Sequence, residues 1–382
     1  MSRFFGGRFG DMIPSSSAAG LEDNSGVFSS RDQYTSKQEG GWAVVSSITA
    51  SGGTVSTYND PTGQGWKVHK FESSGTFDVT KVGSGAYNQV DYLLIAGGAG
   101  GGGMGGGGAG GLIYKTGTSV SVATYPVTIG AGGAVIDSPG GVTPKGNNGA
   151  DSVFALDTSV TAKGGGGGAG WDQGNPSGYP SPGGSGGGAG TPNTSETANP
   201  GTGPGHPGAV DLETPGPFIT AGGWGNSGGN GTPGAYYGGG GGGAQGQGVG
   251  ANPGPGVAGG GGNGAQYTIL TGNPAVGNRW AGGGGGGQQS AGTSGYGGKG
   301  GGGGGGSNPG GSGGTAPNPG DPNFTDYNAG EAGRVSPSPG PQNYGYGGSA
   351  GANTGSGGGG MAVSVGRGGA GGSGILIVRY KT

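Results

Sequence analysis

The chain has 382 residues, of which 118 are glycine and 25 are proline, with a formal net charge of -3 and no cysteine. This composition excludes disulfide frameworks and thiolate metal sites, and the lack of clustered Lys and Arg argues against nucleic-acid binding. Because glycine occurs in solid blocks and not at every third position, a collagen triple helix is also excluded.

Residues 1–41 are polar and show no apolar periodicity, so they cannot fold alone. Two interpretations remain open: a disordered tail, or an arm that orders on a partner. We find no hydrophobic stretch of signal-peptide length here, and no run of about 18 apolar residues anywhere in the chain, so we expect neither Sec-dependent export nor a membrane span. The candidate docking anchors are Arg3, Phe4, Phe5, Arg8 and Phe9.

Strand signals begin after the arm, at residues 42–48, 65–71 and 76–82. Ser73, Ser74 and Gly75 separate the last two segments and predict a tight hairpin between them. Residues 90–96, VDYLLIA, are almost continuously apolar, which is typical of a strand covered on both faces. Further strand signals follow at residues 112–114, 119–122 and 125–129.

Residues 375–380, ILIVRY, form a last apolar strand at the C-terminal end. This strand also needs cover on both faces, so we expect it to pair with residues 90–96 or a close neighbour. Such pairing would make residues 97–374 a closed excursion from one sheet, and that excursion contains the glycine-rich part.

The glycine blocks cannot bury apolar area, yet they lose much backbone entropy on ordering. They can order as polyproline II-type helices, here called rods, which rise about 3.1 Å per residue and bond backbone to backbone. An interior rod tolerates only glycine, whereas a peripheral rod has room for side chains. A flexible linker is the alternative; the length of the region and the apolar strands at both ends disfavour it. The blocks are residues 100–103, 105–108, 164–168, 238–243, 259–262, 282–287, 300–306 and 357–360.

The expected fold is therefore mainly β plus irregular structure: a small β-sheet unit encloses a bundle of polyglycine II helices, with almost no α-helix. We expect three units: an arm at residues 1–41, a β-rich unit at residues 42–163 completed by residues 371–382, and a bundle at residues 164–370.

Four motifs resemble the glycine-rich domain of bacteriophage tail-fibre and virion proteins of the marine cyanobacterial phage type. They are WKVHKFESSGTFDV at 66–79, VDYLLIAGGAGGGGMGGGGAGGLIY at 90–114, DSVFALDTSVTAKGGGGG at 151–168 and GGSGILIVRY at 371–380. The resemblance covers the chain from about residue 65 onward and implies a polyglycine II sandwich, as in some phage adhesins, with host-binding loops at the rod ends. Residues 1–60 match no fibre shaft or trimeric coiled coil.

No pattern in the chain points to catalysis, a cofactor or a metal. Residues 98–103 satisfy G-x-G-x-x-G after a strand, but no helix former follows, as a dinucleotide site requires. Asp321, Asp326 and Glu331 miss the EF-hand spacing, and His206 has no partner in a nucleophile motif. We therefore expect a protein that is not an enzyme and has no cofactor.

Aromatic residues in the segments between glycine blocks are the candidate receptor-binding residues. Tyr and Trp on a rigid scaffold give large contact area at small entropic cost; the alternative is that they pack over the rod ends. They are Trp171, Tyr179, Trp224, Tyr236, Tyr237, Tyr267, Trp280, Tyr296, Phe324, Tyr327, Tyr344 and Tyr346.

The resemblance implies a structural protein of the phage virion, assembled in the host cytoplasm, whose arm at residues 1–41 docks on other virion proteins. It would be a tail fibre or adhesin that attaches to a host-surface saccharide or an outer-membrane protein. The alternative is a head-decorating or other tail-structural protein that binds no receptor. A homotrimer suits a tail fibre, although no heptad or trimer seam is visible. A cellular glycine-rich surface protein or ice-binding protein would show an export signal or regularly spaced threonines, and we find neither.

Overall fold

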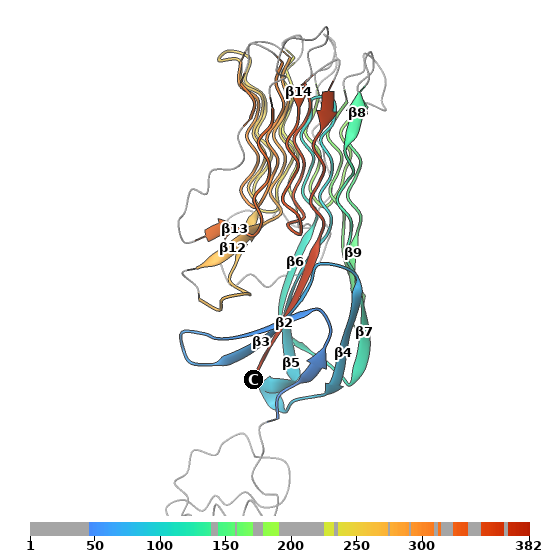
Figure 1. Ribbon diagram of the computed structural model, residues 1–382, viewed down its shortest axis with the longest axis vertical. Helices are drawn as coiled ribbons and strands as arrows, with labels where there is room; N and C mark the ends of the chain where they lie inside the picture. The colour runs from blue at the N-terminus through green and yellow to red at the C-terminus, as the bar shows by residue number, and fades with distance from the viewer. Residues whose placement is uncertain are drawn as a thin grey trace, which may run out of the picture.

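A computed structural model describes residues 46–138, 144–156, 159–170, 179–190, 225–232, 236–273, 276–289, 292–308, 312–314, 324–334, 345–362 and 366–382. The molecule is elongated, with two larger sheets near one end and a bundle of long extended segments towards the other (Figure 1). We call the end that contains Thr382 the proximal end. The distal end is the opposite end of the bundle, where β8 (Ile136–Ser138) and β14 (Gly345–Tyr346) lie.

The first five-stranded sheet has the C-terminal strand at its centre, in the order β2-β3-β16-β5-β6. Leu376 of β16 pairs with Phe71 of β3 on one side and with Leu94 of β5 on the other, so the predicted pairing of residues 375–380 with 90–96 is confirmed. Residues 97–374 are therefore an excursion that starts and ends in this sheet. Its strands are β2 (Thr54–Asn59), β3 (Gly65–Phe71), β5 (Gln89–Ile95), β6 (Leu112–Ser119) and β16 (Ile375–Lys381).

A second five-stranded sheet has the order β1-β4-β7-β9-β10 and is antiparallel throughout. Because β3 and β4 lie in different sheets, the hairpin predicted at Ser73, Ser74 and Gly75 is wrong. The connection turns a corner instead, which lets Phe71 and Phe77 enter the same core. The strands are β1 (Thr49–Ser51), β4 (Gly75–Lys81), β7 (Ala123–Thr128), β9 (Ser152–Ala155) and β10 (Ser159–Ala162).

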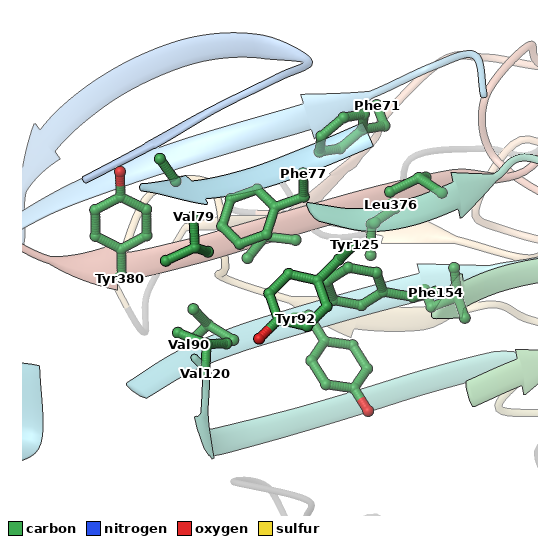
Figure 2. Close-up of a cluster of buried hydrophobic side chains, with 14 of the residues drawn as sticks. Phe71, Phe77, Val79, Val90, Tyr92, Val120, Tyr125, Phe154, Leu376 and Tyr380 are labelled. Atoms are coloured by element: carbon green, nitrogen blue, oxygen red, sulfur yellow. The ribbon is translucent and has the colours of Figure 1, made fainter. Parts of the chain in front are cut away.

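The main hydrophobic core gathers side chains from both of these sheets (Figure 2). Phe77 and Phe154 are completely buried and meet edge to face, with ring centroids 6.2 Å apart. The opposite face of the first sheet has its own cluster, which includes Leu93 and Ile377. Strands β5 and β16 are thus covered on both faces, as their continuous apolar sequences predict.

Two small sheets and one short helix complete the regular structure of the described residues. The proximal small sheet contains β11 (Ala265–Tyr267), β12 (Gly277–Trp280) and β13 (Phe324–Asp326), and the distal one contains β14, β15 (Gly366–Gly368) and β8. The short helix is a 3-10 helix, η1, which spans Gly85–Asn88. The described residues contain no α-helix, so the mainly β character predicted from the sequence is confirmed for this part of the chain.

The extended glycine-rich segments, for which we keep the name rods, bond to one another with a period of three residues. Along residues 106–111, three successive backbone amides donate to three different rods, and amides three residues apart donate to the same rod. The donor and acceptor residues, with N···O distances of 2.7–3.0 Å, are Gly106 to Gly239, Gly107 to Gly358, Gly108 to Gly166, Ala109 to Gly242, Gly110 to Gly355 and Gly111 to Lys163.

The solid glycine block at residues 282–287 lies inside the bundle and hydrogen-bonds to six other rods. An added Cβ at Gly284 would lie 2.0 Å from the carbonyl oxygen of Gly358, so side chains are excluded sterically. Its amides donate to rods in residues 104–107, 259–262 and 303–306, and its carbonyls accept from rods in residues 238–241, 295–298 and 357–360.

A mixed sequence marks a rod at the surface. Residues 245–251 bond to fewer rods than the block at 282–287 does, and the side chains of Gln245, Gln247 and Val249 are exposed. The expected difference between interior and peripheral rods is therefore present in the structure.

Hydrogen bonds between rods join residues on both sides of residue 164, where the sequence predicts a unit boundary. Residues 97–111 bond to rods on several sides, and residues 144–150 bond to the same bundle through Asn147 and Ala150. Residues 97–102, which closely follow β5, therefore already bond to other rods. Residues 1–41, the expected arm, lie outside the described residues.

Candidate binding surface

Only part of the predicted binding set falls on residues whose side chains the structure describes. For Phe324, the structure gives the backbone position, in β13, and no side-chain surroundings. The residues that lie outside the described part of the chain are Trp171, Trp224, Tyr344, Arg3, Phe4, Phe5, Arg8 and Phe9.

Three of the predicted aromatics belong to the proximal joint between the bundle and the first sheet. Trp280 is completely buried and stacks on Tyr327, with ring centroids 5.7 Å apart. Tyr267 packs against Tyr114 of β6, with a centroid distance of 4.8 Å, and burial raises the pKa of its hydroxyl. Since Trp280 has no exposed surface, it is unsuited to contact a receptor; its role is to pack between the rods and the sheet.

Tyr327 also ties the joint to β3 through polar contacts. Lys70 donates a hydrogen bond from Nζ to the Tyr327 hydroxyl at 2.6 Å, and that hydroxyl donates to Glu72 Oε1 at 2.8 Å. Lys70 and Glu72 form an ion pair at 3.2 Å. These contacts hold the bundle to the sheet and leave no free donor for a ligand at this hydroxyl.

Tyr236, Tyr237 and Tyr346 lie at the distal end: Tyr237 pairs with Gln288, and Tyr346 belongs to β14. Tyr237 is buried, whereas Tyr236 is 40% exposed and has a left-handed backbone with φ 58°. Tyr346 of β14 is half-buried and pairs with Arg334. Among these three, Tyr236 presents the largest fraction of its surface to solvent.

Tyr296 and Tyr179 lie in different surroundings. Tyr296 is 49% exposed, and its ring lies against the backbone of Gly260 on the flank of the bundle. Tyr179 is half-buried and precedes the rod at residues 181–190. The predicted set is therefore divided among the proximal joint, the flank and the distal end, and does not form one surface.

A polar cluster at the distal rod ends was not predicted. Gln288, Gln289, Ser307 and Asn308 directly follow the glycine blocks ending at residues 287 and 306, and Gln288 donates a hydrogen bond from Nε2 to Ser307 Oγ at 2.6 Å. A short polar segment after a long glycine block is the sequence signal that could have identified them.

Two of the weak chemical motifs have structural roles in the described residues, whereas His206 and Asp321 lie outside the described part of the chain. Residues 98–103 lie in the rod region, and Gly98 and Gly101 bond to Gly372 and Gly369. The Asp326 carboxylate accepts a hydrogen bond from the Gly300 amide at 2.7 Å, while burial raises its pKa. Within the described residues we find no group of three or more His, Cys, Asp or Glu side chains arranged to hold a metal. No helix in this part of the chain is long and apolar enough to cross a membrane.

Comparison with known families agrees with the sequence pattern. The family described as "Glycine-rich domain" matches residues 72–304, which include most strands of the two larger sheets and much of the bundle. No curated protein matches the chain. Because this match covers more than half of the sequence, the chain belongs to the glycine-rich domain family.

Proposed function

We propose that the rods are polyglycine II helices. A polyproline II-type helix has three residues per turn and no internal hydrogen bonds, so its amides point in three directions and repeat every third residue. The hydrogen bonds of residues 106–111 follow this period, and residues 282–287 have bonded neighbours on six sides. A crystal structure tests the proposal: φ near about -75° along residues 282–287 supports it, whereas values near about -120° to -140° indicate ordinary β-strands and contradict it.

We further infer that the protein is a structural component of a phage virion, most specifically a tail fibre or adhesin that attaches to the host surface with its distal end. The observation that carries this proposal is the polarity of the molecule. The described chain starts at Ser46, whose carbonyl accepts from Ser84, and ends at Thr382, whose amide donates to Gly65. Both ends therefore lie with the sheets, and the bundle extends away from them (Figure 1).

Such an arrangement suits attachment at one end and recognition at the other. The rods bond laterally to several neighbours each, so the scaffold can hold its distal residues in place without a conventional core. At the distal end, Tyr236 supplies an exposed aromatic ring, and Arg367 and Asp137 form an exposed ion pair at 2.8 Å. The four motifs that resemble phage virion proteins give the biological setting.

The test combines imaging with adsorption. A reconstruction of the phage particle should place the protein on the tail with the distal end outward; a position on the head would favour the decorating role and contradict the adhesin. Phage carrying Tyr236→Asn, a substitution compatible with the left-handed backbone, should adsorb to host cells about tenfold more slowly. Tyr296→Asn is the matched control on the flank and should adsorb normally. Equal adsorption of both variants and the wild type would argue against recognition by this end.

A further inference from the structure

The distal polar cluster has a fixed hydrogen-bond arrangement. We define it as Gln288, Gln289, Ser307 and Asn308. Gln288 Nε2 donates to the Gly292 carbonyl at 3.0 Å and to Ser307 Oγ at 2.6 Å, and Ser307 Oγ donates to the Asn308 carbonyl at 3.0 Å. Asn308 Nδ2 donates to the Gln289 carbonyl at 3.2 Å. The amide nitrogens of Gln288 and Asn308 are thus engaged, which fixes the orientation of both side-chain amides.

The oxygens of these amides have no protein partner. Gln288 Oε1, Gln289 Oε1 and Asn308 Oδ1 are all buried and accept no hydrogen bond. Gln288 is completely buried and Asn308 is 9% exposed. Thr232 Oγ1 is a fourth such atom, and its residue is linked to the cluster through Tyr237, whose carbonyl accepts from the Thr232 amide at 3.1 Å.

This concentration of unpaired acceptors is unusual. The described residues contain seven buried side-chain N or O atoms without a partner, and four of them belong to this one region at the distal end. A buried acceptor without a donor costs roughly 1–3 kcal/mol, so a folded protein is expected to keep several together only where something supplies donors. The region is therefore built to receive hydrogen-bond donors.

The charges around the distal polar cluster indicate which kind of ligand supplies the hydrogen-bond donors. Carboxylates usually accompany amide oxygens in calcium sites, and the three amide side chains are neutral. Arg334, whose carbonyl lies 3.5 Å from the Ser307 amide nitrogen, is a charged neighbour of the cluster, and it is cationic. Among the described residues no carboxylate hydrogen-bonds to the cluster, so these residues give a bare cation no compensating negative charge. Hydroxyl groups, in contrast, are neutral donors and match neutral oxygens.

We propose that the distal polar cluster binds the hydroxyl groups of a saccharide, with the exposed ring of Tyr236 as the adjoining apolar surface. The Gln289 amide donates to the Tyr236 carbonyl at 3.1 Å, which fixes the two residues next to one another. Gln289 is the half-buried member of the cluster, so its side-chain amide is the least enclosed of the three, and a rotamer change of this side chain on binding is the movement that the proposal requires. This inference rests on the proposed host attachment and specifies its ligand class.

The test uses the full chain and simple probes. Methyl glycosides of glucose, galactose, mannose and N-acetylglucosamine are screened by saturation-transfer NMR, and the affinity of those that bind is measured by titration. Gln289→Met keeps the side-chain length and removes the acceptor; it should weaken binding at least about tenfold. Gln247→Met, on the exposed peripheral rod, is the matched control and should bind like the wild type. Thermal unfolding checks that both variants are folded.

Several results would overturn the inference. The first is that none of the glycosides binds the wild-type chain, and the second is that Gln289→Met binds them as well as Gln247→Met does. The third is that calcium chloride raises the melting temperature of the wild type but not of Gln289→Met, which would identify a cation site. The adsorption test separates this inference from the proposed function. If Tyr236→Asn phage lose adsorption but the wild-type chain binds no glycoside, only the saccharide inference is contradicted. If the wild-type chain binds a glycoside but Tyr236→Asn and Gln289→Met phage adsorb normally, only the proposed attachment role is contradicted.

Discussion

Asp91 and Arg379 form a buried ion pair between strands from opposite ends of the described chain. Arg379 Nε donates to Asp91 Oδ2 at 2.9 Å across a sequence separation of 288 residues. The guanidinium also donates to the Tyr58 hydroxyl at 3.0 Å and lies 4.3 Å from the ring centroid of Trp66. One side chain on β16 therefore contacts β2, β3 and β5, and the pair can form only when both ends of the excursion are in place.

Replacing Arg379 with Met should destabilise the protein by about 3–5 kcal/mol, because Asp91 would remain buried without its charge partner. Replacing both residues, as Arg379→Met with Asp91→Leu, should recover part of that loss, since no isolated charge remains. Urea unfolding, followed by tryptophan fluorescence, measures both free energies. An Arg379→Met chain with a wild-type midpoint would show that the pair contributes nothing to stability.

Deleting residues 375–382 should prevent folding of the sheets. β16 is the central strand of the first sheet, and Ile375, Leu376, Ile377 and Val378 are completely buried. Without it, β3 and β5 lose their shared partner and both hydrophobic clusters lose side chains. Solubility and circular dichroism of the truncated chain, compared with a chain lacking only Thr382, test this expectation. A soluble truncated chain with a wild-type spectrum would contradict it.

The strands with strong sequence signals were predictable, and their partners were partly so. Continuous apolar sequence in β5 and β16 requires cover on both faces, which is enough to place them in the middle of a sheet and to pair them. Solid glycine blocks predict the interior of the bundle for a related reason, since only a residue without Cβ fits beside six bonded neighbours. In both cases the residue types in the segment indicate how closely it is surrounded by the rest of the fold.

Features that depend on three-dimensional assembly were not predictable. Ser73, Ser74 and Gly75 have the composition of a hairpin turn, and only the positions of β1 and β7 reveal that β4 belongs to another sheet. Trp280 and Tyr236 both lie beside glycine blocks, yet one is packed against the first sheet and the other is exposed. The direction in which a rod runs decides whether an aromatic residue next to it lies at the proximal or the distal end, and the amino-acid composition does not give that direction.

Lowering the pH should destabilise the protein through His69, which is completely buried in the main core. Its Nδ1 lies 2.8 Å from the Gly52 carbonyl, so Nδ1 donates, and the neutral Nε2 accepts from the Tyr380 hydroxyl at 3.2 Å. Burial lowers the pKa of His69 below its ordinary value of 6.5, and the positive charge of Lys67 adds to the shift. The folded state therefore favours the neutral ring.

The sign follows from proton binding. Above pH about 6.5 the His69 ring is neutral in both the folded and the unfolded state. Below this pH the unfolded chain binds a proton on the ring and the folded chain does not, so the free energy of unfolding falls as the pH is lowered to the pKa of the folded state. Its slope in this window should approach about 1.4 kcal/mol per pH unit. Urea unfolding between pH about 7.5 and 5 measures it, with His69→Gln as the control that lacks the titrating ring. An identical pH dependence in wild type and control would assign the effect to other groups.

Adding one methyl group inside the bundle should cost far more than adding it at the surface. The Cβ of Gly284→Ala would lie 2.0 Å from the Gly358 carbonyl oxygen and 2.5 Å from its carbon, both of which are backbone atoms that rotamer changes cannot move. The rods at residues 282–287 and 357–360 would have to separate, and their mutual hydrogen bonds would lengthen. We expect a loss of at least about 3 kcal/mol, the upper end of the range for overpacked cores.

Gly250→Ala is the matched control, because it adds the same methyl group to the exposed rod at residues 245–251. The nearest atom to its Cβ would be the Asn230 carbonyl oxygen at 3.5 Å, an ordinary contact, so stability should change by less than about 0.5 kcal/mol. Thermal and urea unfolding of the two variants give the comparison. If Gly284→Ala is as stable as Gly250→Ala, the rods are not closely packed at this position, and backbone contact among glycines cannot be what orders the middle of the molecule.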